Sequence, residues 1–383
     1  MSRAAHMANR AALLVCGSLA AFLLAGTPAS AAANTGDLHP EADAGISIVN
    51  GKTTSIGKWP WQVGLVLPPS VKPGSPVSRR FFCGGAVIAP RLVITAGHCV
   101  ASLTKRQVRR LYVVSGRTRL NSDRGQTVGI AGFRMPRDAS GKRRYRVIDG
   151  AADWDVALLV LSHPLAAEPI RLAGPSDSSP RLTGQPVWAT GWGYTRPFAS
   201  RVPASLQVTR QVIMGNGICG RIHGRSFRGS TQICLGGPAG NASTCSGDSG
   251  GPLVVPTSDG YRLVGLTSYG SGACLGNVPS VDTRVSPGPI QDWVGRTAMA
   301  ISGRNVVGSG GSIAPPPVWC KVPNVSGRTP SRARQLLEAA GCQLGKVRFD
   351  RMGAGPRGRI IGYSRYPGWL APPGFKMNVW IAP

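Results

Sequence analysis

The stretch that most constrains this chain spans residues 243–253, Ser-Thr-Cys-Ser-Gly-Asp-Ser-Gly-Gly-Pro-Leu. Within it, Ser249 lies between Asp248 and Gly250, a setting suited to a nucleophile. A serine hydroxyl is a weak nucleophile until a neighbouring base accepts its proton, and its attack on a carbonyl creates an oxyanion that needs hydrogen-bond donors. Gly247 and Gly250 have no Cβ, so their backbone can approach a reacting group closely. The fold must therefore bring a base from elsewhere to Ser249.

Other stretches supply the groups that such a serine requires. Residues 95–99, Thr-Ala-Gly-His-Cys, contain His98, and residues 153–161 place two carboxylates before an apolar run. Ile-Val-Asn-Gly at residues 48–51 and Gly-Trp-Gly at residues 191–193 complete the set. Together these motifs resemble the chymotrypsin-type (trypsin-like) serine protease family. The order His, Asp, Ser is that of this family, whereas subtilisins and α/β-hydrolases arrange the same groups differently.

The apolar pattern predicts a mainly β fold. Short apolar runs alternate with Gly, Pro, Ser and Asn turns, and no long stretch has helical periodicity. Strands are predicted over residues 85–88, 92–95, 111–114, 156–161, 185–189, 253–255 and 263–267, with a closing helix over 290–294. The resemblance, which covers about residues 48–300, implies two antiparallel β-barrels. His98 and Asp155 would come from the first barrel and Ser249 from the second.

The resemblance implies a catalytic role for each of three residues. Ser249 would attack the peptide carbonyl, and His98 would accept its proton and return it to the leaving amine. Asp155, directly before the apolar strand, would orient His98, while Asp153 is expected to be solvated. The backbone N–H groups of Gly247 and Ser249 would form the oxyanion hole. No cofactor is expected.

The histidine count supports the choice of base. Once an N-terminal leader is removed, only three histidines remain, and His163 and His223 lie in loop-like sequence without partners. His98 is therefore the base by elimination as well as by its motif.

The resemblance also places a substrate pocket, whose residues would be Ser243, Ser268, Tyr269, Gly270 and Ser280. Ser243 would lie at the base of the pocket, where an Asp would bind Arg or Lys, and Ser280 stands where Gly is usual and would narrow it. The expected preference is for uncharged, apolar side chains. Asp282, which replaces an aromatic residue, could place a negative charge at the base, so a basic preference is the alternative. Ser268 would also help to hold Asp155, and Tyr269 and Gly270 would pair with the substrate backbone.

In this family, cleavage before the Ile-Val motif frees an ammonium that inserts beside the Asp preceding the nucleophile. Here the activation pair would be Ile48 and Asp248, with residues 32–47 as a propeptide. Ser47 precedes the cut, which argues against activation by a trypsin-specific protease. The family's calcium loop would correspond to residues 117–127, where Asp123 is the one acidic side chain. No metal site is expected.

The N-terminus and the cysteines indicate export. Residues 1–31 resemble a signal peptide, with Arg3 and Arg10 before a short apolar run, and no other stretch is apolar enough to span a membrane. Of nine cysteines, all but Cys16 would remain in a secreted mature protein, an even number. The resemblance pairs Cys83 with Cys99, Cys219 with Cys234 and Cys245 with Cys274, which leaves Cys320 with Cys342.

The C-terminal part needs a separate interpretation. Residues 303–317 have the composition of a Gly/Ser/Pro linker, and residues 318–383 resemble a PASTA-like module, a small α+β domain. A helix is predicted over 333–341 and strands over 358–361 and 377–381. PASTA modules are associated with cell-wall fragments. The net charge of +28 also fits an anionic wall polymer such as peptidoglycan, although an Arg-favouring genome explains it equally well.

Two functions follow from these observations. The first is a secreted serine endopeptidase with a wall-directed tail, acting on protein or peptide substrates. The alternative is a catalytically inactive protease-fold protein that binds cell wall, against which the intact His98, Asp155 and Ser249 argue. Scattered Arg without an aromatic-interleaved basic patch argues against specific nucleic-acid binding.

Overall fold

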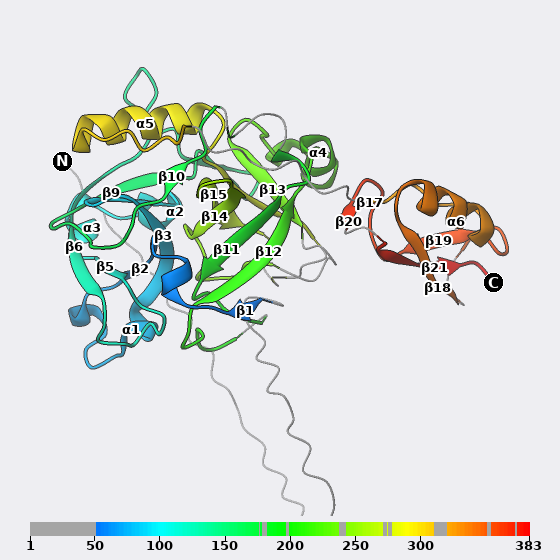
Figure 1. Ribbon diagram of the computed structural model, residues 1–383, viewed down its shortest axis with the longest axis horizontal. Coiled ribbons are helices and arrows are strands. Elements are labelled where there is room, and N and C mark those ends of the chain that lie inside the picture. Colours follow the sequence, from blue (N-terminus) through cyan, green and yellow to red (C-terminus); the bar gives the residue numbers. More distant parts are fainter. Residues whose placement is uncertain are drawn as a thin grey trace, which may run out of the picture. The chain divides into compact units, whose positions relative to one another are not determined.

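The computed structural model describes residues 51–175, 177, 182–196, 199–236, 243–270, 274, 278–309, 320–350, 354–371 and 374–383 (Figure 1). The expected signal peptide, propeptide and Ile48, and most of the expected linker, lie outside the described residues. Among the residues described, none of the helices has the length and apolar character needed to cross a bilayer.

The first β-barrel is closed by six antiparallel strands in the order β2-β3-β4-β9-β6-β5 (Figure 1). The strands are β2 (Gln62–Val66), β3 (Phe81–Ala89), β4 (Leu92–Thr95), β5 (Tyr112–Ser115), β6 (Gln126–Arg134) and β9 (Ala157–Leu161). Their apolar side chains fill the interior, and Val63, Leu92 and Leu158 are fully buried. Because β4 ends just before His98 and β9 begins just after Asp155, closing this barrel brings these two residues together.

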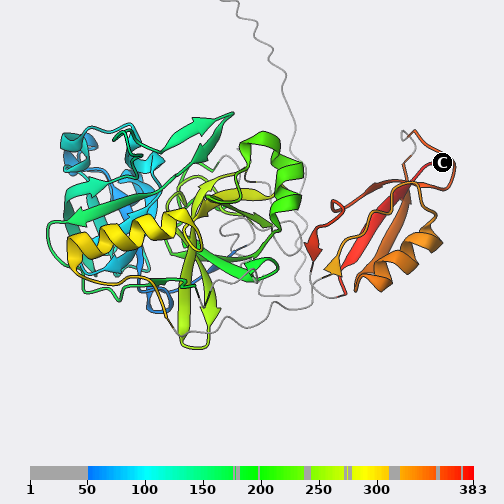
Figure 2. The ribbon, with the colours of Figure 1, turned by 90° about the horizontal axis from the view of Figure 1, so that it is seen from above.

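The second barrel follows the path β12-β11-β14-β15-β16-β13, and the pairing of β12 with β13 closes it (Figure 2). The strands are β11 (Pro186–Gly191), β12 (Gln207–Ile213), β13 (Gln232–Gly236), β14 (Pro252–Thr257), β15 (Gly260–Tyr269) and β16 (Ser280–Arg284). Two short strands add to this sheet, β1 (Lys52–Thr53) on β12 and β10 (Arg171–Leu172) on β15. The prediction of a mainly β fold with two antiparallel barrels is confirmed.

Short helices and one hairpin complete this part of the chain. The helices are α1 (Val77–Arg80), α2 (His98–Ala101), α3 (Lys105–Val108), α4 (Asn216–His223) and α5 (Pro289–Ser302). Helix α5 is longer than the predicted 290–294, because Val294 and Ala298 continue its buried face and Gly303, at φ +64°, ends it in the left-handed conformation. The hairpin of β7 (Arg146–Ile148) and β8 (Ala151–Asp153) was not predicted.

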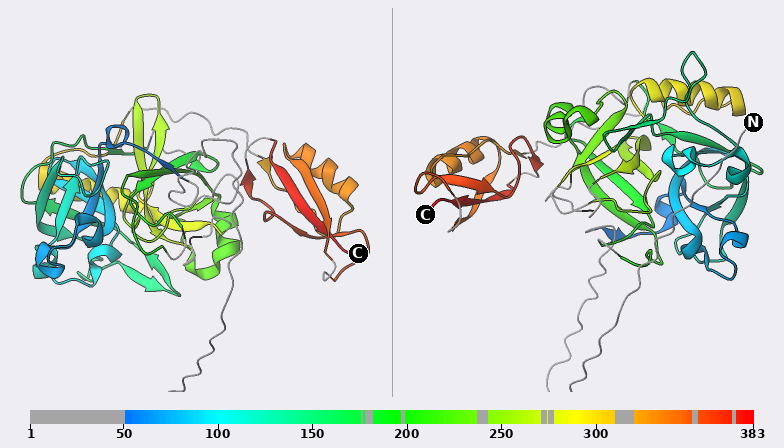
Figure 3. Two further views of the ribbon diagram at one scale, coloured as in Figure 1. Left: turned by 90° about the horizontal axis from the view of Figure 1, so that it is seen from below. Right: turned by 180° about the vertical axis from the view of Figure 1, so that it is seen from behind.

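The C-terminal segment combines one helix with short β-strands. It contains β17 (Cys320–Lys321), α6 (Pro330–Ala339), β18 (Gln343–Phe349), β19 (Ile360–Tyr363), β20 (Leu370–Ala371) and β21 (Lys376–Ile381). Thr329 caps the start of helix α6, because its hydroxyl accepts from the Arg332 amide at 3.3 Å. The helix packs beside the sheet β18-β21-β19 (Figure 3). Leu337 and Val379 are fully buried. Helix α6 and strands β19 and β21 were predicted, whereas β18 was not.

Four disulfides brace these elements. They join Cys83 to Cys99, Cys219 to Cys234, Cys245 to Cys274, and Cys320 to Cys342. These are the pairs that the sequence analysis expected. The first ties β3 to the turn of helix that carries His98, and the third anchors the segment that leads into Ser249. Disulfides of this kind typically contribute about 2–4 kcal/mol each to the free energy of unfolding.

Candidate active site

His98 is placed by a close contact between the end of β4 and the start of β9. It is the first residue of α2, and the preceding Gly97 leaves no room for a side chain. A Cβ on Gly97 would lie 3.0 Å from the Val156 nitrogen and 3.2 Å from Oδ1 of Asp155. Glycine therefore lets the His98 turn lie directly against the Asp155 carboxylate.

Asp155 is 1% exposed, and both of its carboxylate oxygens accept hydrogen bonds. Oδ1 accepts from the His98 amide at 2.7 Å, and Oδ2 lies 2.8 Å from His98 Nδ1. Oδ2 also accepts from the Ser268 hydroxyl at 2.6 Å. Because this carboxylate is buried and paired, the arrangement favours the His98 tautomer that carries its proton on Nδ1. Nε2 is then free to act as a base.

The pKa of His98 is raised above its ordinary value. Burial is the largest influence and lowers it, but the hydrogen bond from Asp155 and the charge of that carboxylate together outweigh the burial. Stabilisation of the imidazolium is what a general base needs when it accepts a proton during the reaction.

The loop that carries Ser249 lies against the first barrel. The Gly84 amide of β3 donates to the Ser249 carbonyl at 2.7 Å, and the Cys99 sulfur lies 3.8 Å from the same oxygen. Gly250 has φ +79°, and a Cβ there would collide with the Thr95 hydroxyl and lie 2.7 Å from the Gly84 oxygen. The missing side chain thus allows the Ser249 turn to approach the strand that ends beside His98.

The two expected oxyanion donors are the backbone amides of Gly247 and Ser249. Among the described residues, neither the Gly247 amide nor the Ser249 amide donates to another backbone group. Gly247 has φ +98°, and a Cβ there would lie 3.0 Å from the Cα of Gly193. Backbone amides of a serine and of the residue two positions before it can together stabilise a developing oxyanion.

Asp248 is 1% exposed and faces the Gly-Trp-Gly motif. Its carboxylate accepts from the Gly193 amide at 2.8 Å and from the Cys245 amide at 3.0 Å. Burial raises the pKa of Asp248 to about 6, and the two amide donors only partly oppose this. No cation pairs with this carboxylate among the described residues, while Ile48, its expected partner, lies outside them.

The raised pKa of Asp248 predicts a pH-dependent stability for the uncleaved chain. The stabilisation is fully present below the unfolded value of 3.8 and is lost as the pH rises through about 6, because the folded state then holds a buried charge. The Ser249→Ala chain, which would not process itself, should lose about 3 kcal/mol of unfolding free energy over this window. Urea denaturation at a series of pH values measures the loss.

The matched variant for that measurement adds Asp248→Asn to the same chain. The difference in unfolding free energy between the two proteins should then change by the same amount between pH 4 and 7. A difference that is constant over this range would contradict the raised pKa.

The expectation that Asp153 is solvated is wrong. Asp153 is 2% exposed, and its Oδ2 accepts from Arg146 at 3.0 Å while its Oδ1 accepts from the Thr231 hydroxyl at 2.6 Å. Arg146 reaches it across the β7–β8 hairpin, and Thr231 comes from the second barrel. Asp153 therefore holds the segment before Asp155 against the second barrel, whereas Asp155 contacts His98.

The expected pocket residues cluster around Asp282. Gly270 lies against Ser280, since a Cβ on Gly270 would be 3.5 Å from that of Ser280. The Ser280 hydroxyl donates to Asp282 at 2.7 Å, and the Ser268 amide donates to the same carboxylate at 3.0 Å. Tyr269 places its hydroxyl 3.3 Å from the Gln232 amide nitrogen.

Ser243 is the remaining pocket residue. It is 6% exposed, and its hydroxyl donates to the Thr244 carbonyl at 2.9 Å. Its side chain is therefore engaged with the backbone of its own loop.

The loop at residues 117–127 holds a guanidinium. Arg117 is 7% exposed and donates to the Arg124 carbonyl at 3.0 Å, the Leu120 carbonyl at 3.2 Å and the Thr127 hydroxyl at 2.9 Å. A calcium ion needs such oxygens and more carboxylates than Asp123 alone. Because the Arg117 guanidinium already binds the acceptor oxygens of this loop, these residues do not fit a calcium ion. The Cys83 and Cys99 sulfurs beside His98 are joined in a disulfide and are not free ligands.

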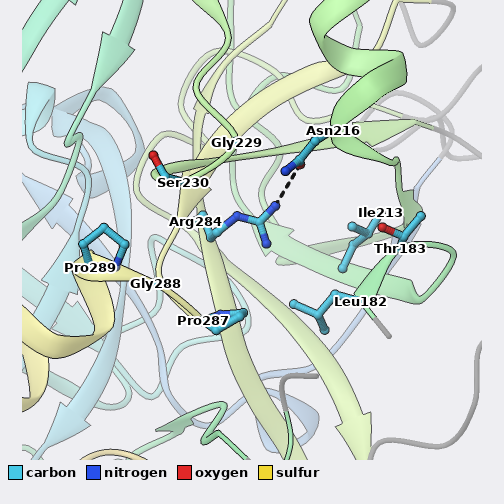
Figure 4. A pocket seen from close by; sticks show the side chains of 10 residues that line it. All are labelled: Leu182, Thr183, Ile213, Asn216, Gly229, Ser230, Arg284, Pro287, Gly288 and Pro289. Atoms are coloured by element: carbon cyan, nitrogen blue, oxygen red, sulfur yellow. Dashed lines mark hydrogen bonds between the residues drawn. The ribbon is translucent and has the colours of Figure 1, made fainter. Parts of the chain in front are cut away.

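A cavity of about 620 Å³ lies beside β16 and the start of α5. Figure 4 shows Arg284 at its centre, with Nη2 donating to Asn216 at 3.2 Å. It is lined by Leu182, Thr183, Ile213, Asn216, Gly229, Ser230, Arg284, Pro287, Gly288 and Pro289. None of the three expected catalytic residues lines it. The candidate active site is therefore identified by the hydrogen bonds between His98 and Asp155 and not by this cavity.

The sequence motifs name His98, Asp155 and Ser249 as the expected catalytic residues, but they do not name the residues that position them. Thr283 donates its hydroxyl to the Asp155 carbonyl at 2.8 Å, and Gly84 holds the Ser249 carbonyl. No motif marks either residue.

Comparison with known proteins agrees with this geometry. The sequence profile of the trypsin family, described as Trypsin, matches residues 48–294. The human protein named transmembrane protease serine 5 is 31% identical over 257 residues, which cover 66% of this chain and 51% of that protein. The chain thus spans about half the length of this curated relative. Because the family profile matches well over half of the sequence, the chain belongs to the trypsin family of chymotrypsin-like serine endopeptidases.

Proposed function

We propose that this chain is a serine endopeptidase that hydrolyses peptide bonds through an acyl-enzyme. Ser249 attacks the carbonyl, and His98 accepts the serine proton and delivers it to the leaving amine. Asp155 orients the imidazole and stabilises its cation, while the Gly247 and Ser249 amides stabilise the oxyanion. A water molecule then gives a proton to His98 and attacks the acyl-enzyme carbonyl. His98 returns this proton to Ser249 as the carboxylic acid product leaves.

One observation carries this proposal. The buried Asp155 carboxylate accepts hydrogen bonds from the backbone and the ring of His98 and from Ser268. The Ser249 loop contacts the same barrel, because the Gly84 amide donates to the Ser249 carbonyl. A carboxylate used only for structure would not need to fix the tautomer of a histidine that is partly exposed, with 30% of its side chain accessible. This arrangement supports catalysis rather than a protease-fold binding protein.

Labelling with a fluorophosphonate tests the proposal, because such reagents react only with an activated serine. The processed wild-type protein should be labelled and Ser249→Ala should not. Ser302→Ala is the matched control, since the Ser302 hydroxyl donates to the Ala298 carbonyl at the end of α5, and it should label like wild type. Equal labelling of wild type and Ser249→Ala would refute the proposal.

For the substrate, we propose cleavage after uncharged, apolar residues. Ser243 stands at the expected pocket base. The Ser243 hydroxyl donates to the Thr244 carbonyl and the Ser280 hydroxyl donates to Asp282, so both are engaged within the protein. Asp282 is buried and each of its oxygens accepts a hydrogen bond from the protein, which supports a pocket base that offers no free carboxylate to a substrate side chain. Profiling cleavage in a random peptide mixture separates the alternatives, since cuts mainly after Arg and Lys would favour the basic preference.

We also propose that the protein is secreted as a zymogen, with residues 1–31 as signal peptide and 32–47 as propeptide. The four disulfides support an oxidising compartment. The buried Asp248 carboxylate supports activation by an inserted Ile48 ammonium, since an unpaired buried charge is costly. Sequencing the N-terminus of active protein should find Ile48 first. An active form that retains residues 32–47 would contradict this.

For the C-terminal part, we propose a PASTA-like module, residues 318–383, that binds peptidoglycan. Strand β18 supports this, because Lys346, Val347, Arg348 and Phe349 are all exposed on it. Cations and an aromatic ring on one strand suit an anionic glycopeptide. Sedimentation with purified peptidoglycan compares the full chain with a chain ending at residue 317. Binding that is unchanged by the truncation, or abolished by moderate salt, would contradict the proposal.

A further inference from the structure

Three buried carboxylates lie behind His98, and one of them has no cationic partner. Asp153, Asp155 and Asp282 are each at most 2% exposed. Asp153 is paired with Arg146, and Asp155 with His98. Among the described residues, no cation forms an ion pair with Asp282. Buried carboxylates are usually paired, so an unpaired one beside a catalytic site calls for a role.

Asp282 is joined to Asp155 through a single residue. It lies in the middle of β16, opposite Ile233 of β13. Its Oδ1 accepts from the Ser268 amide at 3.0 Å, and the Ser268 hydroxyl donates to Asp155 at 2.6 Å. Ser268 thus gives one donor to each carboxylate. The Ser280 hydroxyl completes the site by donating to Asp282 Oδ2 at 2.7 Å.

The groups that surround Asp282 are acidic or neutral. Asp155 faces it from the start of β9, and its charge raises the pKa of Asp282. Tyr269 faces it from β15, and its own pKa is raised by burial first and then by Asp282, Asp153 and Asp155. On the side of β13, Gln232 is neutral and donates to the Tyr269 hydroxyl. His223 bonds to the backbone of Pro279, and burial lowers the pKa of its imidazole.

Burial is the largest influence on the pKa of Asp282 and raises it to about 7. The hydrogen bonds from the Ser268 amide and the Ser280 hydroxyl favour the charged form and only partly oppose this rise. The charge of Asp282 therefore changes near neutral pH. His98 also has a raised pKa.

We propose that Asp282 is a positioning residue of the triad, which acts through Ser268 and, when ionised, makes His98 more basic and stabilises its imidazolium. This inference rests on the proposed function and deepens it. Asp282 need not touch the substrate, because its charge acts across Ser268 on the Asp155–His98 pair. Two negative charges behind one imidazole favour the protonated ring more than one does.

The proposal predicts a coupled titration. Protonation of His98 favours ionisation of Asp282, and protonation of Asp282 disfavours protonation of His98. The pair therefore takes up its protons over a wider pH range than one isolated group. The acid limb of kcat/KM, which reports the free enzyme, should be broader than a single-proton curve.

Asp282→Asn tests this in the full-length chain, because the amide is nearly the same size but cannot ionise. The His98 ring is followed by NMR over pH 4–9, with His98→Ala to assign its signals. The titration of His98 should become a single-proton curve and move to lower pH by about half a unit to one unit. The acid limb of kcat/KM should move in the same direction. A purely structural role would not shift either titration.

The matched control is Asp177→Asn, which removes another buried carboxylate that pairs with Arg262 at 3.3 Å and contacts no triad residue. Its His98 titration should match wild type. An unshifted His98 titration in Asp282→Asn, or an equal shift in Asp177→Asn, would overturn the proposal.

The NMR titration does not depend on turnover, so it separates this proposal from the proposed function. An unshifted His98 in a protein that labels with fluorophosphonate would refute the role of Asp282 alone. Should Asp282→Asn fail to fold, wild type still decides the question. Its His98 signal should show a second inflection from the ionisation of Asp282, and a simple one-proton curve in wild type would overturn the proposal.

Discussion

Replacement of His98 by Ala is expected to lower kcat for peptide hydrolysis about 10⁶-fold, with little change in KM. The methyl group cannot accept the Ser249 proton or return it to the amine. The Gly247 and Ser249 amides would still stabilise the oxyanion, so a residual rate above that in water should remain. Steady-state hydrolysis of an apolar-site peptide by processed protein measures both constants.

His163→Ala is the matched control for this prediction. His163 is exposed on the loop after β9, with its Nδ1 3.1 Å from the Ser162 hydroxyl and no contact to Asp155. Its kcat should equal that of wild type. A positioned general base contributes at least about 10²-fold to the rate. If His98→Ala kept more than about one hundredth of the wild-type kcat, His98 would therefore not be the general base.

The local motifs carried most of the information about the site. Thr-Ala-Gly-His-Cys and Gly-Asp-Ser-Gly-Gly contain glycines that the fold requires, because Gly97 contacts Asp155 and Gly250 contacts Thr95. Those requirements are local, so they are visible in the sequence. Barrel closure could also be predicted, because the alternation of short apolar runs and turns admits few other arrangements.

Interactions between distant segments could not be predicted in the same way. Asp153 was expected in solvent because nothing near it in sequence shows that Thr231, 78 residues later, donates to it. The unpredicted β7–β8 hairpin is what brings Arg146 to the same carboxylate. Strand β18 was missed because most of its residues are exposed, so it lacks the apolar alternation that marks a strand.

Asp282 shows the same limit at the pocket. The sequence placed it near the pocket base and left open whether its charge would face a substrate. Its partners, the Ser268 amide and the Ser280 hydroxyl, are set by the pairing of β15 with β16 and by a register shift in that pairing. Side-chain direction at such an irregularity depends on packing rather than on the two-residue period of a strand.

Asp155→Asn is expected to lower kcat about 10⁴-fold at neutral pH without unfolding the protein. The hydrogen bonds give the reason. Oδ1 faces the backbone amide of His98, which can only donate, so the oxygen of the new amide must take that position. The NH₂ group then faces His98 Nδ1, which must become an acceptor. The ring proton moves to Nε2, and the imidazole can no longer accept the proton of Ser249.

Asp153→Asn provides the comparison that assigns this role to one carboxylate. Asp153 is equally buried and only two residues away, but it binds Arg146 and Thr231 rather than His98. Loss of its charge should lower Tm while kcat stays within about tenfold of wild type, because breaking a buried ion pair mainly costs stability. ¹⁵N NMR of the His98 ring should show the Nε2–H tautomer in Asp155→Asn and the Nδ1–H tautomer in Asp153→Asn. The opposite result, with Asp153→Asn inactive and Asp155→Asn active, would move the orienting role to Asp153.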